Sequence, residues 1–122
     1  MKFVFDNKLP VYIQLLEQLK TAIVTGRFAP GEKLPSVREL ALEAKLNPNT
    51  VQKALAELEA ERLIYTERTN GKFVSTDKAV LENAKNSLAN EALTNYLKTM
   101  KNLGFDREQA SEFIKKAKKE EN

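Results

Sequence analysis

Apolar residues recur every three or four positions through most of this chain, a spacing that gives a helix one apolar face. In the first such segment, about residues 10–26, the apolar positions are Tyr12, Leu15, Leu16, Leu19 and Ile23. In the second they are Val37, Leu40, Ala41 and Ala44. In the third they are Val51, Ala54, Leu55 and Leu58. The pattern therefore predicts an amphipathic helix in each of these segments, all ahead of Leu63.

Helix-start signals precede the second and third helices. Ser36 is followed three positions later by Glu39, which is the sequence of a capping box. Asn47 is a good N-cap residue, because its side-chain oxygen can accept a hydrogen bond from a first-turn amide. Pro48 then falls at the first helical position, where no amide hydrogen is needed and the fixed φ of proline suits a helix. The stretch "NPNT" therefore predicts the start of a helix.

The period changes after Leu63, where apolar and polar residues alternate in "LIYTERTNGKFVST". Alternation around Asn-Gly is a strong signal for a β-hairpin with a two-residue turn. We expect strands at about 64–68 and 72–76, with Asn70 and Gly71 as the turn.

A helical pattern returns at Asp77, with its apolar face at Leu81, Ala84, Leu88, Ala92, Tyr96 (or Leu93), Met100 and Leu103. It predicts a helix of about 26 residues that ends at Gly104. Asp106 and Gln109 can then cap a last helix. Such a helix pair cannot bury its apolar face alone, so the stripe either folds back on the N-terminal part or pairs with a second chain. We expect two domains, residues 1–76 and 77–122.

Composition excludes several function classes. The 122 residues are 42% hydrophobic and 30% charged, with a net charge of +3 and no cysteine or histidine. Disulfides, thiolate or imidazole metal sites and the usual general base are therefore absent, so we expect no metal, no cofactor and no enzymatic activity. No apolar run approaches the roughly 18 residues of a membrane span, and the first residues lack the long apolar stretch of a signal peptide. We expect a soluble, cytoplasmic protein without a membrane partner.

Three helices followed by a β-hairpin are the order of a winged helix-turn-helix, whose third helix enters the DNA major groove. The expected fold class is α+β, mainly α, with a C-terminal two-helix extension. Residues 9–76 closely resemble the DNA-binding domain of GntR-type bacterial transcription regulators. The agreeing positions are Pro30-Gly31, Leu34-Pro35-Ser36, Arg38-Glu39-Leu40, Asn49-Thr50-Val51, Leu55, Leu58 and Gly71.

The "NPNTVQ" form and the short tail, residues 77–122, resemble the YtrA subfamily, whose members carry a short helical dimerisation region. The resemblance implies a homodimeric regulator, usually a repressor, that binds a palindromic operator. The competing function is a winged-helix protein–protein interaction module, for which an acidic or apolar recognition helix is expected. Whether an effector binds, for example between the tail helices of two chains, stays open.

Polar residues near the expected groove are the candidates for DNA contact. Asparagine can pair bidentately with adenine, and threonine offers a hydroxyl and a methyl group, which favours Asn49 and Thr50 as base contacts. Arg38 suits a phosphate or a guanine, and Gly71 lets the wing approach a minor groove. The full predicted DNA-binding set is Ser36, Arg38, Asn47, Asn49, Thr50, Gln52, Lys53, Arg68, Asn70, Gly71 and Lys72. Lys33 is a weaker candidate, and the alternative for each charged residue is a plain solvated surface.

Charge placement explains how so small a net charge is compatible with DNA binding. We expect the acidic residues of the third helix to lie toward its C-terminal end, and the basic residues to gather at the opposite end. The acidic group is Glu57, Glu59 and Glu61, and the basic group is Arg38, Lys53, Arg68 and Lys72. The predicted dimerisation residues are Leu81, Leu88, Leu93, Tyr96, Leu97, Met100, Leu103 and Phe113.

Overall fold

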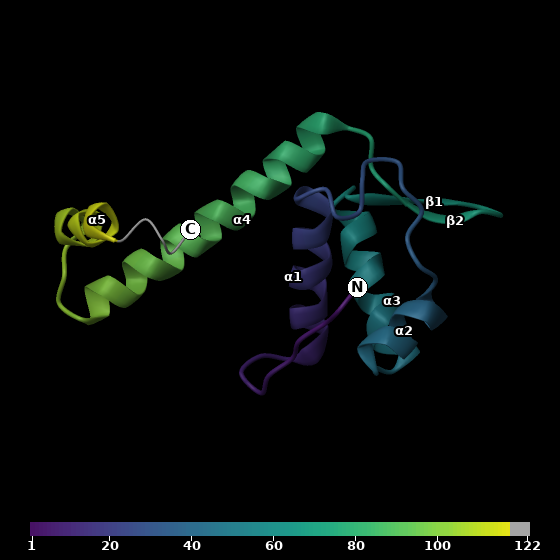
Figure 1. The fold of residues 1–122 in the computed structure, drawn as a ribbon, viewed down its shortest axis with the longest axis horizontal. Helices are drawn as coiled ribbons and strands as arrows, with labels where there is room; N and C mark the ends of the chain where they lie inside the picture. Colours follow the sequence, from purple (N-terminus) through teal and green to yellow (C-terminus); the bar gives the residue numbers. More distant parts are fainter. Residues whose placement is uncertain (118–122) are drawn as a thin grey trace. The chain divides into compact units, whose positions relative to one another are not determined.

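The computed structural model describes residues 1–117, and it divides the chain into two compact units, residues 1–85 and a second unit that begins at Asn86 (Figure 1). The helices are α1 (Val11–Val24), α2 (Val37–Ala44), α3 (Pro48–Ala60), α4 (Lys78–Asn102) and α5 (Arg107–Lys116). The strands β1 (Ile64–Glu67) and β2 (Gly71–Val74) form an antiparallel hairpin. The predicted fold class, three helices with a two-stranded wing followed by two further helices, is confirmed.

One hydrophobic core holds the first unit together. It is built from the predicted apolar faces of α1, α2 and α3, which meet the buried ends of the hairpin. Its largest fully buried side chains are Leu15, Leu19, Ile23, Leu40, Val51, Leu55, Leu58, Leu63, Ile64 and Val74. The helical period of the sequence therefore identified this core, because burial follows the face of each helix.

The predicted caps of α2 and α3 are present. The Ser36 hydroxyl accepts a hydrogen bond from the Glu39 amide at 3.1 Å, and the Ser36 amide donates to the Glu39 carboxylate at 2.8 Å. Asn47 Oδ1 accepts from the Asn49 amide at 2.8 Å, and Pro48 is the first residue of α3. Between the two helices Lys45 takes the left-handed conformation, with φ of 57°. These local contacts fix where α2 ends and where α3 begins.

The hairpin differs from its prediction in the turn. Glu67 pairs with Gly71, so the turn has the three residues 68–70, and the predicted two-residue turn is wrong. The Asn70 amide donates to the Glu67 carbonyl at 3.2 Å. A two-residue type I′ turn needs positive φ at both central positions. Here Gly71 has φ of 103°, whereas Asn70 is not among the residues of the described chain with positive φ. The strands are correspondingly shorter than predicted.

Residues 31–34 extend the hairpin along the free edge of β2, which the sequence did not predict. The Gly31 amide donates to the Val74 carbonyl, the Val74 amide to the Glu32 carbonyl and the Leu34 amide to the Lys72 carbonyl, each at 2.9 Å. Because Leu34 is itself buried, these bonds tie the inner end of the hairpin to the core.

Two glutamines of α1 bind the backbone of the N-terminal segment. Gln18 exchanges two hydrogen bonds with Val4, at 3.1 and 2.7 Å. Gln14 does the same with Asp6, at 3.0 and 2.9 Å, and also donates to the Leu9 carbonyl. Phe3 and Phe5 pack against the core beside them. The first residues are thus part of the first unit, although they belong to no helix or strand.

In the second unit, α5 packs against the end of α4. The Tyr96 hydroxyl donates to the Ala110 carbonyl at 2.8 Å, and the rings of Phe105 and Phe113 meet edge to face at 5.1 Å. Asp106 and Gln109 form the predicted capping box.

No helix within residues 1–117 is long and apolar enough to cross a membrane.

Candidate nucleic-acid interface

The first turns of α3 present polar side chains on the face opposite the core. Val51 is fully buried, whereas Asn49, Gln52 and Lys53 are exposed and Thr50 is half-buried. Asn47 lies just before them, and its side-chain oxygen is occupied by the cap hydrogen bond to the Asn49 amide. The helix start therefore separates a capping residue from residues whose side chains face solvent.

The start of α2 presents Ser36 and Arg38, both exposed. The Ser36 hydroxyl oxygen accepts the capping hydrogen bond from the Glu39 amide. None of the ion pairs within residues 1–117 involves Arg38. The hydrogen bond from the Ser36 backbone amide, supported by the Ser36 hydroxyl, lowers the pKa of Glu39 below its ordinary value of 4.5. Glu39 is therefore ionised at neutral pH, where it stabilises the helix start.

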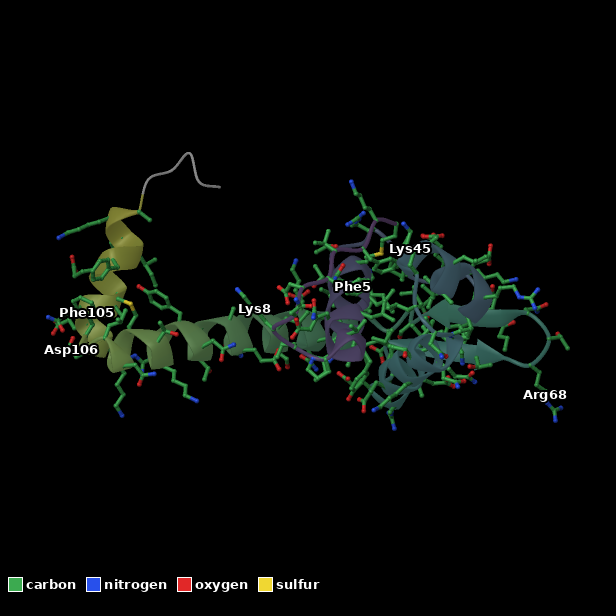
Figure 2. All side chains as sticks on the ribbon, turned by 90° about the horizontal axis from the view of Figure 1, so that it is seen from below. Phe5, Lys8, Lys45, Arg68, Phe105 and Asp106 are labelled. Carbon is green, nitrogen blue, oxygen red and sulfur yellow. The ribbon has the colours of Figure 1, made fainter. Side chains whose placement is uncertain are left out.

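The tip of the hairpin carries Arg68 and Asn70, which are both exposed. Figure 2 shows the Arg68 side chain extending from the tip, away from the helices of the first unit. Asn70 Nδ2 donates to Glu67 across the turn at 3.3 Å. The Lys33 side chain lies against Gly71, because a Cβ atom at that glycine would lie 3.2 Å from Lys33 Cε. The weaker candidate Lys33 is thus brought beside the predicted wing residues.

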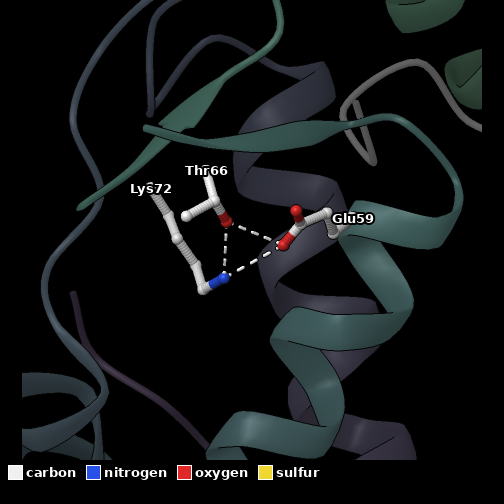
Figure 3. Close-up of polar contacts among 3 residues, drawn as sticks. All are labelled: Glu59, Thr66 and Lys72. Atoms are coloured by element: carbon white, nitrogen blue, oxygen red, sulfur yellow. Dashed lines mark hydrogen bonds and ion pairs between the residues drawn. The ribbon is translucent and has the colours of Figure 1, made fainter. Parts of the chain in front are cut away.

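Lys72 is not where the charge pattern predicted it. Its Nζ lies 3.0 Å from Glu59 Oε1 and donates to Thr66 Oγ1 at 2.8 Å, and the Thr66 hydroxyl donates to the same Glu59 oxygen at 2.9 Å (Figure 3). The expectation that Lys72 lies at the end of α3 away from Glu59 is therefore wrong. The reason is the register, which pairs Lys72 with Thr66 and brings both side chains to the C-terminal part of α3.

The contact also changes the acidity of Glu59. The hydrogen bond from Lys72, followed by that from Thr66, lowers the pKa of the Glu59 carboxyl below its ordinary value of 4.5. Glu61, two residues further on, pairs with Lys20 of α1 at 2.9 Å. Two of the three acidic residues at this end of α3 are therefore neutralised by lysines of neighbouring elements.

Tyr12 is a neighbour of the candidate residues that sequence reasoning missed. Lys53 Nζ lies 4.0 Å from the centre of the Tyr12 ring, a cation–π contact between α3 and the start of α1. The sequence assigned Tyr12 only to the apolar face of its helix. No local signal links the two residues, since they lie far apart in the chain.

The predicted dimerisation residues have different surroundings. Leu81 packs against the core of the first unit, together with Val80 and Ala84. In the second unit Met100 is buried, and Tyr96, Leu88 and Leu97 are half-buried. The members that stay clearly exposed are Leu93 (44%), Leu103 (66%) and Phe113 (53%).

Ile114 belongs with the exposed members, at 57% exposure, although the predicted set omits it. Its spacing of four residues from Ala110 and three from Ala117 was the signal that could have found it. A hollow of about 370 Å³ lies within the second unit beside these side chains. Its lining is Tyr96, Met100, Leu103, Phe105, Phe113, Ile114 and Ala117.

Comparison with known proteins identifies the family. The protein-family model described as "Bacterial regulatory proteins, gntR family" matches residues 11–74 of this chain. The uncharacterized HTH-type transcriptional regulator YhcF of Bacillus subtilis (strain 168) is 37% identical over 91% of this chain and 92% of its own length. The HTH-type transcriptional repressor YtrA of the same strain is 42% identical over 82% of this chain and 72% of its own length.

Solved structures agree with the sequence relatives. A GntR family transcriptional regulator from Listeria monocytogenes superposes with a TM-score of 0.85, at 40% identity, over 93% of this chain and 100% of that one. AraR(DBD) in complex with operator ORX1 superposes with a TM-score of 0.57, at 28% identity, over 62% of this chain and 96% of that one. The chain therefore belongs to the GntR family of bacterial regulatory proteins, within its YtrA-like subfamily, and is a transcription regulator with a winged helix-turn-helix.

Proposed function

We propose that this protein is a cytoplasmic repressor that binds a palindromic DNA operator as a homodimer. The observation that carries the proposal is the start of α3, where Asn47 holds the cap and Asn49 and Thr50 are left on the solvent side of the first turn. A groove-reading helix makes its base contacts from this turn. The DNA complex of AraR(DBD), a structural neighbour, and the repressor name of the relative YtrA support it.

Base reading is assigned to α3 and phosphate contact to the residues around it. Asn49 pairs with adenine, Thr50 contacts a thymine methyl group, and Gln52 offers a further amide. Lys53 is suited to a phosphate, and so is Arg38 with the Ser36 hydroxyl, at the starts of α3 and α2. Asn47 contributes by fixing the first turn.

At the hairpin tip, Arg68 and Asn70 are assigned to the minor groove and its phosphates. The absence of a Cβ at Gly71 lets the backbone approach closely there. Lys33 lies beside the same glycine and adds a third positive or polar group to this part of the wing.

Dimerisation is assigned to the apolar residues of the second unit. Leu93, Leu103, Phe113 and Ile114 expose large apolar side chains that α4 and α5 do not cover within the described residues. A second copy of the chain fits this surface best, because two-fold symmetry of the protein matches an inverted repeat in the operator. Leu81, which packs on the first unit, is then a lesser contributor.

A salt titration of DNA affinity tests the phosphate contacts. Each neutralised phosphate contributes about −0.9 to the slope of log K against log salt for duplex DNA. Arg38→Ala is expected to make the slope shallower by about one contact per subunit. Arg107→Ala, an exposed arginine of the second unit, serves as the matched control and leaves the slope unchanged. An affinity of the wild-type protein that does not vary with salt refutes the proposed surface.

A further inference from the structure

A polar contact joins the wing to the recognition helix α3. Lys72 of β2 and Thr66 of β1 both reach Glu59, and the three side chains form a closed triangle of hydrogen bonds of 2.8 to 3.0 Å (Figure 3). The Glu59 side chain is 41% exposed and that of Lys72 is 28% exposed, so the contact lies at the surface. Such a contact adds little to overall stability. Its effect is on the position of the hairpin.

The outer part of the hairpin has few other attachments. Its inner end is anchored by the buried residues Ile64 and Val74, and the strand-like residues 31–34 pair with the edge of β2 as far as Lys72. Beyond the pair of Thr66 with Lys72 there is one further pair, Glu67 with Gly71, and then the turn. Thr66 and Lys72 are therefore the last residues before the tip at which the hairpin is tied to a helix by side chains, and Arg68 extends from that tip.

We propose that Lys72 is a positioning residue, whose pairing with Glu59 and Thr66 sets the wing against α3 so that Arg68 reaches the DNA. This inference rests on the proposed function and replaces the phosphate contact that the sequence predicted for Lys72. A lysine ammonium has three donors, and two of them are engaged within the chain. To bind a phosphate, Lys72 would have to leave both partners, and the ionised Glu59 would lose its counter-charge.

The neighbouring ion pair provides a matched control. Glu61 lies two residues after Glu59, at the C-cap of the same helix, and pairs with Lys20 of α1 at 2.9 Å, against 3.0 Å for Glu59 with Lys72. Its side chain is 40% exposed, nearly the same as that of Glu59. Removing either carboxylate removes one negative charge from the C-terminal end of α3, but of the two only Glu59 contacts the wing.

The experiment compares Lys72→Met, Glu59→Gln and Glu61→Gln in anisotropy titrations with a duplex that the wild-type protein binds specifically. Lys72→Met is expected to weaken binding about two- to fivefold, the factor given by the coupling of an exposed ion pair. Glu59→Gln is expected to bind more weakly than Glu61→Gln. The exchanged pair Glu59→Lys with Lys72→Glu is expected to recover the affinity that Lys72→Glu alone loses.

A phosphate contact by Lys72 gives the opposite results. Glu59→Gln would release the lysine toward DNA and bind more tightly than Glu61→Gln. That outcome overturns the inference, and so does equal affinity of Lys72→Met, Glu59→Gln and the wild type.

Hydrogen exchange in the free protein separates this inference from the proposed function. Amides of residues 66–72 are expected to exchange faster in Lys72→Met than in the wild type, while those of α3 stay protected. If the wild type binds no DNA at low salt, the proposed function fails, and the exchange data still report whether the contact holds the wing. Unchanged exchange in residues 66–72 overturns the inference even when DNA binding is observed.

Discussion

Asn47 and Asn49 stand two positions apart at the start of α3, and we predict that their alanine variants fail in different ways. Asn47→Ala removes the 2.8 Å hydrogen bond from the Asn49 amide. Loss of an N-cap asparagine costs about 1 kcal/mol, within a range of roughly 0.5 to 2 kcal/mol. Because α3 carries Val51, Leu55 and Leu58 in the core, this cost appears in the unfolding of the whole first unit.

Asn49→Ala has the opposite profile. The Asn49 side chain is exposed, and within residues 1–117 it makes no hydrogen bond, so the free energy of unfolding is expected to change by no more than about 0.5 kcal/mol. Specific DNA affinity is expected to fall by about 1–3 kcal/mol, if the amide pairs with adenine. That loss corresponds to a factor of about 5 to 150 in the dissociation constant.

Urea unfolding at one fixed protein concentration measures the loss of stability, since the proposed dimerisation would make stability depend on concentration. A loss of 1 kcal/mol lowers Tm by about 4–8 °C for a domain of 60–100 residues. Asn47→Ser keeps a capping oxygen and is the matched control, expected to remain near the wild type. Anisotropy with specific and unrelated duplexes measures the DNA term. The reasoning is refuted if the two alanine variants lose equal stability, or if Asn49→Ala weakens binding to all DNA alike.

Three further predictions follow from the packing, the caps and the second unit. Leu55 is fully buried, so Leu55→Ala is expected to lower the free energy of unfolding, measured in urea, by about 2–5 kcal/mol. Leu42 is 73% exposed, so Leu42→Ala should change it by no more than about 0.5 kcal/mol. Similar losses in the two variants contradict the described core. Because the pKa of Glu39 is lowered in the folded protein, its ionised carboxylate stabilises the fold above pH 4.5, and this contribution is lost as the pH falls through the pKa of the folded state. Glu39→Gln keeps a capping oxygen but cannot titrate, so its free energy of unfolding should fall less on acidification than that of the wild type. An identical fall in both proteins contradicts this role of Glu39. The double variant Leu88→Lys, Leu97→Lys is expected to elute as a monomer in chromatography with light scattering, whereas the control Leu42→Lys is expected to behave as the wild type. A double variant that remains dimeric would place the apolar face of α4 inside the chain's own core.

Local signals account for what could be predicted from the sequence. Ser36, Asn47 and Asp106 cap their helices as expected, because a cap is decided by residues two or three positions apart. The apolar faces of α1 and α3 could be predicted equally well, since helical spacing alone determines which residues share a face.

The remaining features depend on residues distant in the chain. The hairpin register, the pairing of residues 31–34 with β2 and the contact of Lys72 with Glu59 arise only when separate elements pack together. Charge counting placed Lys72 with the DNA-facing residues because the sequence carries no signal for the side of the hairpin that meets α3. The contact of Tyr12 with Lys53 was hidden for the same reason.

Selection of bound sequences from a random DNA pool with the purified protein tests the central claim most directly. We predict enrichment of an inverted repeat, and each half-site is expected to lose its preferred base at one position when Asn49→Ala replaces the wild type. Enrichment of a palindrome would establish specific binding and two-fold symmetry together. A pool that shows no enriched sequence at low salt would contradict the assignment of this protein as an operator-binding dimer.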